Sequence, residues 1–288
     1  MRDFVIMTDS SCDLPVEIVN DYDIKVAPMG LNFDGVPHKH YNDYRELSMR
    51  DYYDGMRNGK VGSTAGTNMI DAMDMMRKSL EDNKDIIYLS ISSGLSCSYQ
   101  NACLAADELR EEYEDARIEV IDTKSVCLGV GIMVYLAAKK KAAGETYDQI
   151  LDYLRVTSNN VYHCFMADDL SHLQRSGRIS HLTAVVGTAL GIKPIFMIGA
   201  DGKVQTDGKV RGRKAGIKYI VDKAKEKTVD PTIFCVCHAD APDDAEVIKA
   251  KLLEAHPDAE IIIGNVGPII GVNTGVGTLA TICISDNR

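Results

Sequence analysis

DIIYLSISSGLSCSYQNACLAADELREEYEDARIEVID, residues 85–122, is the segment that decides the fold class. It begins with an apolar run, DIIYLSIS, that predicts a buried strand. From Ser96 to Tyr113, apolar side chains recur at helical spacing, and RIEVID then predicts a second buried strand. A helix that joins two such strands is typical of a parallel sheet, because parallel strands need a crossover connection.

The same alternation continues on both sides of this segment. Residues 4–8 predict a strand, the residues that follow predict a helix with Asp13 as its N-cap, and residues 126–143 predict another helix. Thr67 is the expected N-cap of a helix that carries several methionines on one face. We therefore expect the first half of the chain to form a mostly parallel, doubly wound α/β sheet.

Local turn and cap signals support this assignment. Ser48 with Asp51, and Thr146 with Gln149, have the spacing of capping boxes at helix starts. The pair Asp34-Gly35 predicts the turn of a hairpin.

The second half is expected to mix strands and helices less regularly. Strands are predicted over residues 161–167, 191–199, 203–210, 232–239, 259–264 and 278–284, and helices over residues 212–227 and 243–255. We therefore expect two α/β domains, an N-terminal one over residues 1–160 and a C-terminal one over residues 161–288.

The composition is that of a folded globular protein. Of its 288 residues, 45% are apolar and 26% are charged. The net charge of −10 argues against a nucleic-acid-binding surface, which needs a basic excess. No segment approaches the roughly 20 apolar residues of a membrane-spanning helix, and the first residues turn polar too soon for a signal peptide. These features predict a cytoplasmic protein.

The eight cysteines show no Cys-x-x-Cys spacing, and most lie in apolar runs. This usage is typical of a reducing compartment without a disulfide framework. Cys235, Cys237 and His238 could suggest a metal site, but they fall within a predicted strand, and we expect no metal there.

The common catalytic motifs are missing from the sequence: the GxSxG elbow, the phosphate-binding P-loop, HExxH, and GxGxxG after a strand. Asp9 ends the first predicted strand, where α/β proteins often place functional groups. An Asp followed by Ser10 can equally cap a turn, and the pattern leaves both interpretations open.

Hydroxyl side chains crowd two turns at which a helix is expected to begin, residues 62–67 and residues 92–99. The hydroxyl residues of these turns are Ser63, Thr64, Thr67, Ser92, Ser93, Ser96, Ser98 and Tyr99. A helix N-terminus offers unpaired N–H groups and a partial positive charge, so added hydroxyl donors suit a carboxylate or a phosphate. Plain N-capping needs only one such side chain per helix, and the surplus therefore favours a ligand.

The segment DDLSHLQRSGRIS, residues 168–180, gathers basic side chains in an otherwise acidic chain. A solvated surface with local ion pairs is the ordinary explanation for such a run. Arg178 lies between Gly177 and Ile179, and an Arg beside such a turn can be aimed outward at a carboxylate or phosphate.

Taken together, these segments resemble the DegV family. The matching motifs, in chain order, are TDSSCDLP (8–15), VGSTAGTN (61–68), SISSGLSCSYQNA (90–102), VIDTKS (120–125), DDLSHLQRSGRIS (168–180) and GPIIGVNTGVG (267–277). The resemblance implies two α/β domains with a lipid tunnel between them and a bound long-chain fatty acid. It also implies a role as the fatty-acid-presenting subunit of a bacterial fatty acid kinase, whose separate ATP-binding subunit makes acyl phosphate.

The resemblance also implies roles for individual residues. By motif position, Thr64 and Ser96 hold the fatty-acid carboxylate, with Ser63 and Ser93 as near neighbours. Arg178 matches a position implicated in docking the kinase subunit.

The sequence departs from the family pattern in three of these motifs. Asn273 stands where the family usually has a His near the carboxylate. Ala65-Gly66 replaces Gln-Pro, and Cys97 replaces Gly.

Two other functions stay open on the sequence. One is an α/β enzyme that acts on a small anionic substrate through Asp9 or a Ser, although no His is tied to a nucleophile in a known motif. The other is a lipid-responsive regulatory protein, which the sequence does not separate from a fatty-acid-presenting one.

Overall fold

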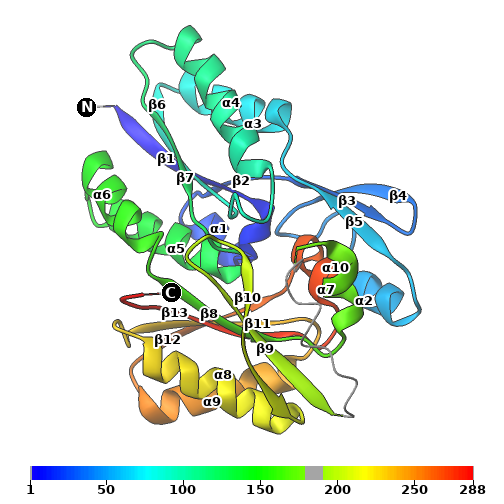
Figure 1. The fold of residues 1–288 in the computed structure, drawn as a ribbon. Helices are drawn as coiled ribbons and strands as arrows, with labels where there is room; N and C mark the ends of the chain where they lie inside the picture. Colours follow the sequence, from blue (N-terminus) through cyan, green and yellow to red (C-terminus); the bar gives the residue numbers. More distant parts are fainter. Residues whose placement is uncertain (1, 179–190, 288) are drawn as a thin grey trace.

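The structure is a computed structural model, and it describes residues 2–178 and 191–287 (Figure 1). A four-stranded sheet forms one half of the molecule, with the strand order β2-β1-β6-β7 and every neighbouring pair parallel. Its strands are β1 (Asp3–Asp9), β2 (Lys25–Ala27), β6 (Lys84–Ser90) and β7 (Ile118–Asp122). The prediction of a parallel sheet is confirmed.

Helices cover both faces of this sheet, as a doubly wound fold requires. On one face lie α3 (Met69–Glu81) and α4 (Ser98–Glu112), and on the other α5 (Leu128–Ala142) and α6 (Tyr147–Thr157). Side chains alternate along a strand, so Val5 and Met7 pack with the first pair of helices, whereas Phe4 and Ile6 pack with the second. Because both faces of strand β1 are buried, its sequence is a continuous apolar run.

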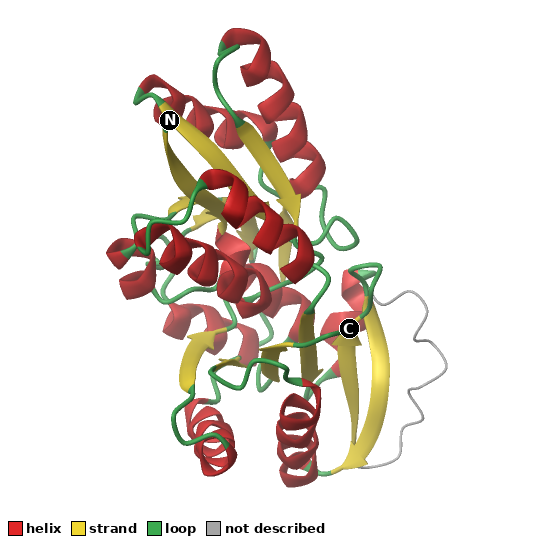
Figure 2. Cartoon of the chain, turned by 90° about the vertical axis from the view of Figure 1, so that its left-hand side faces the viewer, coloured by secondary structure: helices red, strands yellow, loops and turns green. Residues whose placement is uncertain are grey.

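The second large sheet has six strands in the order β10-β9-β8-β13-β11-β12. All neighbours are antiparallel except β11 and β12. Its strands are β8 (Val161–Met166), β9 (Ile192–Ile198), β10 (Val204–Arg211), β11 (Ile233–His238), β12 (Glu260–Asn265) and β13 (Leu279–Ile284). Helices α8 (Arg213–Lys227) and α9 (Pro242–Ala255) cover its outer face, as Figure 2 shows at the lower end of the molecule.

A small antiparallel sheet in the order β4-β3-β5 completes the fold. Its strands are β3 (Met29–Phe33), β4 (Val36–His40) and β5 (Gly62–Ala65), and the predicted hairpin at Asp34-Gly35 joins β3 to β4. The remaining helices are a 3-10 turn η1 (Ser10–Cys12), α1 (Val16–Asp21), α2 (Met49–Arg57), α7 (Leu170–Ser176) and α10 (Pro268–Thr274).

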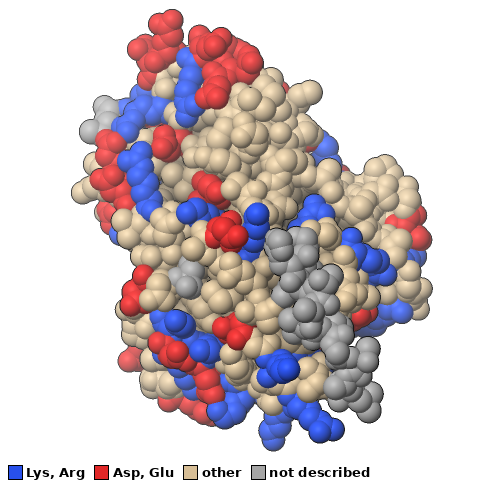
Figure 3. Space-filling model, in the orientation of Figure 1, with Lys and Arg blue, Asp and Glu red and all other residues tan. Residues whose placement is uncertain are grey.

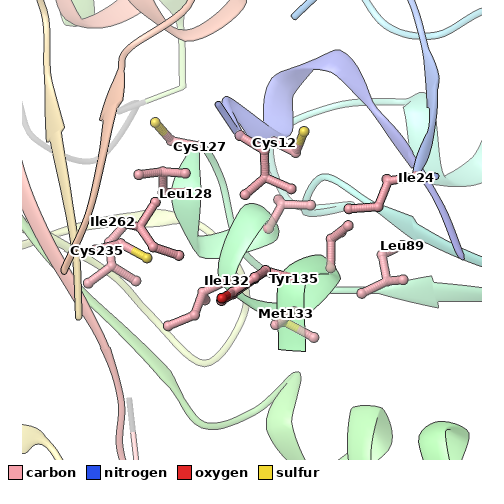
Figure 4. Packing of buried hydrophobic residues seen from close by; sticks show 14 of the residues in the cluster. Cys12, Ile24, Leu89, Cys127, Leu128, Ile132, Met133, Tyr135, Cys235 and Ile262 are labelled. Atoms are coloured by element: carbon pink, nitrogen blue, oxygen red, sulfur yellow. The ribbon is translucent and has the colours of Figure 1, made fainter. Parts of the chain in front are cut away.

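Helix α5 lies between the two large sheets and is buried on almost every side. Figure 4 shows Leu128 and Ile132 of this helix near Cys235 and Ile262 of the six-stranded sheet, with Leu89 of the four-stranded sheet on the other side. Because both sheets pack on it, α5 has no polar face, and its sequence is apolar except at the end.

Three local predictions are confirmed and two are wrong. Ser48 caps α2, the Thr146–Gln149 capping box is present at α6, and Cys235, Cys237 and His238 lie on strand β11. Asp13 is not the N-cap of α1, because it ends the 3-10 turn in a left-handed conformation (φ 51°) and Pro15 takes the N-cap position. Thr67 is fully buried, and its neighbour Asn68 caps α3 instead.

The four-stranded sheet draws its strands from residues 3–122 and the six-stranded sheet from residues 161–284. A division of the chain at residue 160 is consistent with this, and it remains a prediction. Within the described part of the chain, no helix combines the length and apolar character needed to cross a membrane.

Candidate functional site

A cavity of about 430 Å³ is lined by segments of both halves of the molecule and by the start of α5. Apolar side chains supply most of its wall, namely Met29, Ile91, Leu95, Val126, Phe165, Leu173, Ile198, Val204, Val266, Ile269, Ile270, Ala280 and Ile282. The volume falls within the roughly 300–1,000 Å³ of small-molecule sites. The space suits a largely apolar ligand.

Polar side chains line the cavity around the end of β5 and the start of α4. These residues are Thr64, Asn68, Ser96, Asn101 and Asn273. Gly66 lies directly against this group, because a Cβ atom there would come within 2.8 Å of Ser98 Oγ and 3.0 Å of Ser96 Oγ. The absence of a side chain at Gly66 therefore lets the two hydroxyl-rich segments approach each other.

Hydrogen bonds tie these two segments together. The Thr67 N–H donates to Ser98 Oγ at 3.0 Å, and the Asn101 side-chain amide donates to the Thr67 carbonyl at 2.8 Å. Ser96 Oγ accepts from the Ser98 N–H at 3.2 Å and lies 2.9 Å from Ser98 Oγ. The arrangement fixes Ser96 beside the N-terminus of α4, where the partial positive charge of the helix favours an anion.

The structure brings Thr64 to this cavity, but not from a helix start. Thr64 and Ser63 lie on strand β5, where they pair with Leu31 and Asn32 of β3. The prediction that residues 62–67 form a helix start is wrong, because β3 supplies the hydrogen-bond partners that make this segment a strand. Ser63 lines a neighbouring groove of about 280 Å³. Thr64 lines both this groove and the cavity.

Ser93 does not reach the cavity. Its N–H donates to Asp122 Oδ1 at 3.1 Å and its hydroxyl to Asp122 Oδ2 at 2.5 Å. These bonds hold the exposed Ser93 side chain at the end of β7, and it does not line the cavity.

Arg178 lies where the cavity meets the neighbouring groove, beside Thr64 and Asn273. The Arg178 side chain is exposed, and its Nη1 donates to the Ser176 carbonyl at 2.6 Å. Lys60 and Arg175 also line the groove, which makes it basic. Figure 3 shows several Lys and Arg side chains on the face that carries α7.

Asn273 lies on α10 and lines both spaces. Its amide Nδ2 donates to the Ile269 carbonyl at 2.8 Å, one helical turn earlier. This bond orients the side chain and leaves the carbonyl oxygen as the end that can accept a hydrogen bond from a ligand.

Asp9 is fully buried and is not among the residues that line the cavity. Its carboxylate accepts hydrogen bonds from the Ile91 N–H at 2.9 Å and the Ser11 N–H at 3.1 Å, and from the hydroxyls of Ser11 and Ser90. Burial raises the pKa of Asp9, against the effect of these bonds. Of the two interpretations left open above, the structure supports the turn-capping one.

Several residues that line the cavity were not predicted from the sequence. Asn101 is four residues after Cys97 on α4, and that helical spacing could have placed it above the same turn. Cys127, His163 and Cys237 also line the cavity, and no local pattern distinguishes them from ordinary core residues. In residues 2–178 and 191–287, no cluster of three or more His, Cys, Asp or Glu side chains could hold a metal ion.

Known proteins share both the sequence and the fold. A curated DegV domain-containing protein of Clostridium perfringens is 35% identical over 291 aligned residues, covering 100% of this chain and 99% of that protein. The solved structure of a DegV family protein from Thermus thermophilus, described as fatty acid binding, superposes with a TM-score of 0.86 at 26% identity and covers 99% of this chain and 100% of its own.

The solved structure of DegV from Bacillus subtilis, described as a fatty acid binding protein, has a TM-score of 0.83 at 25% identity, with coverages of 99% and 100%. A family model described as "Uncharacterised protein, DegV family" matches residues 3–286. With the fold and nearly the whole sequence in agreement, this chain belongs to the DegV family.

Proposed function

We propose that this protein binds one long-chain fatty acid, with the acyl chain in the 430 Å³ cavity and the carboxylate held by Thr64 and Ser96. The observation that carries the proposal is the division of the cavity wall. Apolar side chains line most of it, and hydroxyl and amide groups gather beside the N-terminus of α4. An amphipathic carboxylate matches both parts.

Apolar burial is sufficient to hold such a ligand. A sixteen-carbon chain buries about 15 methylene or methyl groups at roughly 0.8 kcal/mol each, or about 12 kcal/mol in total. Immobilisation of the ligand and ordering of side chains offset several kcal/mol of this. The acyl chain therefore supplies affinity, and the polar groups set its orientation.

The polar groups prevent the carboxylate from being buried without partners, which is costly. Thr64 and Ser96 offer hydroxyl donors, and the first N–H groups of α4 add a favourable dipole. We keep Asn273 and Ser63 in the proposed ligand site, since Asn273 lines the cavity and Ser63 the adjoining groove. The fatty-acid-binding relatives from Thermus thermophilus and Bacillus subtilis support the same ligand class.

We further propose that the bound carboxylate is presented to a separate ATP-binding kinase subunit in the cytoplasm, which converts it to acyl phosphate. The exposed Arg178 beside Thr64, together with Lys60 and Arg175 in the basic groove, supports this part of the proposal. Guanidinium groups form paired hydrogen bonds with phosphate or carboxylate oxygens, so Arg178 suits a partner that brings a phosphoryl group.

Mass spectrometry of lipid extracted from the purified protein tests the ligand. We expect a long-chain fatty acid at close to one molecule per chain. A small polar anion in its place would contradict the proposal and favour an enzyme acting on a small substrate.

A further inference from the structure

Two cysteines lie against each other in the cavity wall. Cys127 immediately precedes α5, Cys237 lies on β11, and their sulfur atoms are 3.4 Å apart. Both residues line the cavity, and Cys237 pairs in the sheet with Ala280, which also lines it. The proposed fatty-acid function makes no use of these thiols.

A carboxylate accompanies the pair. The Cys127 thiol donates to Asp13 Oδ2 at 2.8 Å, and Asp13 is only 2% exposed. Burial raises the pKa of Asp13 to about 7, although the hydrogen bond from Cys127 lowers it. A base with a pKa near the ambient pH is well suited to accept a proton during a reaction.

The surroundings hold Cys127 in a defined position. Its backbone adopts φ 55° and ψ −143°, a conformation that residues other than glycine rarely occupy. Burial raises the pKa of the Cys127 thiol well above its usual range, so it reacts only when a neighbouring group takes its proton. Asp13 is placed to do so.

Access to the pair runs through the cavity. Cys127 is 5% exposed and Cys237 is 0% exposed, so an oxidant reaches the sulfurs as an occupant of the cavity. The cavity selects an amphipathic acyl chain, if the function proposed above holds. The oxidant that such a chain can carry is a hydroperoxide on an oxidised unsaturated fatty acid.

We propose that Cys127 and Cys237 form a dithiol site that reduces the hydroperoxide of a bound fatty acid to the corresponding hydroxy acid. Cys127 Sγ attacks the terminal peroxide oxygen, the O–O bond breaks, and the Cys127 proton passes through Asp13 to the alkoxide. The products of this step are the hydroxy fatty acid and a sulfenic acid on Cys127.

Cys237 then completes the reaction. Its sulfur attacks Cys127 Sγ, an S–S bond forms, and the S–O bond breaks as the hydroxyl leaves with the Cys237 proton as water. Two thiols lose two electrons and the peroxide gains two. An external thiol reductant returns the disulfide to the dithiol. The sulfurs need to close from 3.4 Å to about 2.05 Å, which is a small movement.

A single-turnover reaction tests the proposal. Reduced, delipidated protein is mixed with an excess of linoleic acid hydroperoxide, and the hydroxy acid and the cysteine-linked peptides are identified by mass spectrometry after digestion without reductant. We expect one hydroxy acid per chain and a peptide pair joined through Cys127 and Cys237. Preloading with palmitic acid, kept in excess over the hydroperoxide, should slow the reaction, because the substrate is then excluded from the cavity.

Variants separate the roles of the two sulfurs. Cys127→Ser should abolish reduction, whereas Cys237→Ser should leave a sulfenic acid on Cys127 that dimedone traps. Cys235→Ser is the matched control, because Cys235 is equally buried on β11 but does not line the cavity, and it should react as the wild type does. Analysis of wild-type peptides keeps the test valid should a variant fail to fold.

Three outcomes would overturn the inference. One is unchanged reduction in a folded Cys127→Ser variant, and another is a linkage through Cys97 or Cys103 in place of the predicted pair. The third is a protein that binds linoleic acid hydroperoxide but keeps both thiols reduced, which would leave the proposed fatty-acid function intact. A protein that binds no fatty acid at all would instead fail the proposed function, and the substrate assigned here with it.

Discussion

Thr64 and Ser96 reach the cavity from a strand and from a turn before a helix, and Gly66 lets the two segments meet. Hydrogen bonds to a charged group contribute about 1.5–3 kcal/mol each when they are shielded from water. The affinity for a fatty acid should therefore depend strongly on hydrogen bonds from these two hydroxyls to its carboxylate.

Replacing both hydroxyls, Thr64→Ala with Ser96→Ala, should weaken fatty-acid binding by about tenfold or more, since donors to the carboxylate are lost. A fluorescent fatty-acid displacement titration measures the change in Kd. Ser93→Ala is the matched control, because that hydroxyl bonds Asp122 away from the cavity, and its Kd should equal that of the wild type. Full affinity in a cooperatively folded double variant would contradict the assignment.

Asp13 makes stability depend on pH. Burial raises its pKa from 3.8 to about 7, so between these values the folded protein binds more protons at Asp13 than the unfolded protein does. The contribution of this group to the free energy of unfolding therefore falls as the pH rises through that range. The Asp13→Asn variant should not show this decrease in the free energy of unfolding, because an amide does not titrate.

We expect the free energy of unfolding of Asp13→Asn, relative to wild type, to increase by up to about 4 kcal/mol between about pH 4 and pH 8. Urea denaturation at a series of pH values measures this difference. His40, whose pKa burial lowers to about 4, lies close to Asp13 and adds the opposite trend over part of this pH range. A difference that does not change with pH would show that Asp13 titrates normally.

Helix α5 is the element on which both large sheets pack, and glycines allow the close contacts. A Cβ atom at Gly129 would lie 1.9 Å from Nε2 of His163 on β8, and one at Gly131 would lie 2.7 Å from the Cys12 carbonyl oxygen. The glycines thus set the distance between the helix and its neighbours, at a cost in helix propensity.

Gly129→Ala should lower the free energy of unfolding by roughly 1–3 kcal/mol, because the added methyl group forces the helix away from β8. In an exposed helix the same Gly→Ala change would raise the free energy of unfolding by up to about 1 kcal/mol. Gly216→Ala in α8 is a milder comparison, since its nearest contact is the flexible thioether of Met166. Urea denaturation of the three proteins checks the order, and a more stable Gly129→Ala variant would contradict this packing.

Both halves of the molecule line the cavity, so a ligand bound there contacts both and should stabilise the fold. A ligand that binds only the folded state adds about 2.7 kcal/mol at a hundredfold excess over its Kd. We expect delipidated protein to melt at a lower temperature and to regain its Tm when palmitic acid is added. Calorimetry measures this, and the Thr64→Ala, Ser96→Ala double variant should regain less. Equal Tm values with and without lipid would argue against binding inside the cavity.

Presentation of the bound carboxylate to a kinase subunit is a second property that depends on the whole molecule. Arg178→Ala should keep fatty-acid affinity but reduce acyl-phosphate formation by a cognate ATP-binding kinase subunit, because an exposed guanidinium beside the cavity is lost. A reconstituted kinase assay, with lipid affinity measured in parallel, checks this. An equal loss of affinity and activity would instead place Arg178 in the ligand site.

The sequence by itself determined the elements whose signals are local. The apolar runs of β1 and β6, the helix between β6 and β7, and the caps of α2 and α6 all depend on residues a few positions apart. The order of motifs likewise indicates the DegV family, and the assignment of Thr64 and Ser96 to the fatty-acid carboxylate, which the resemblance implies, stays a prediction.

Only the tertiary structure decided what depends on distant partners. Residues 62–65 are a strand because β3, some thirty positions earlier, supplies their hydrogen bonds, and no local pattern records that pairing. The contacts that Cys127 makes with Asp13 and Cys237 span 114 and 110 positions of sequence. Each of these residues reads locally as a core or turn position, because the chemistry of such a cluster exists only once folding has brought its members within a few ångströms.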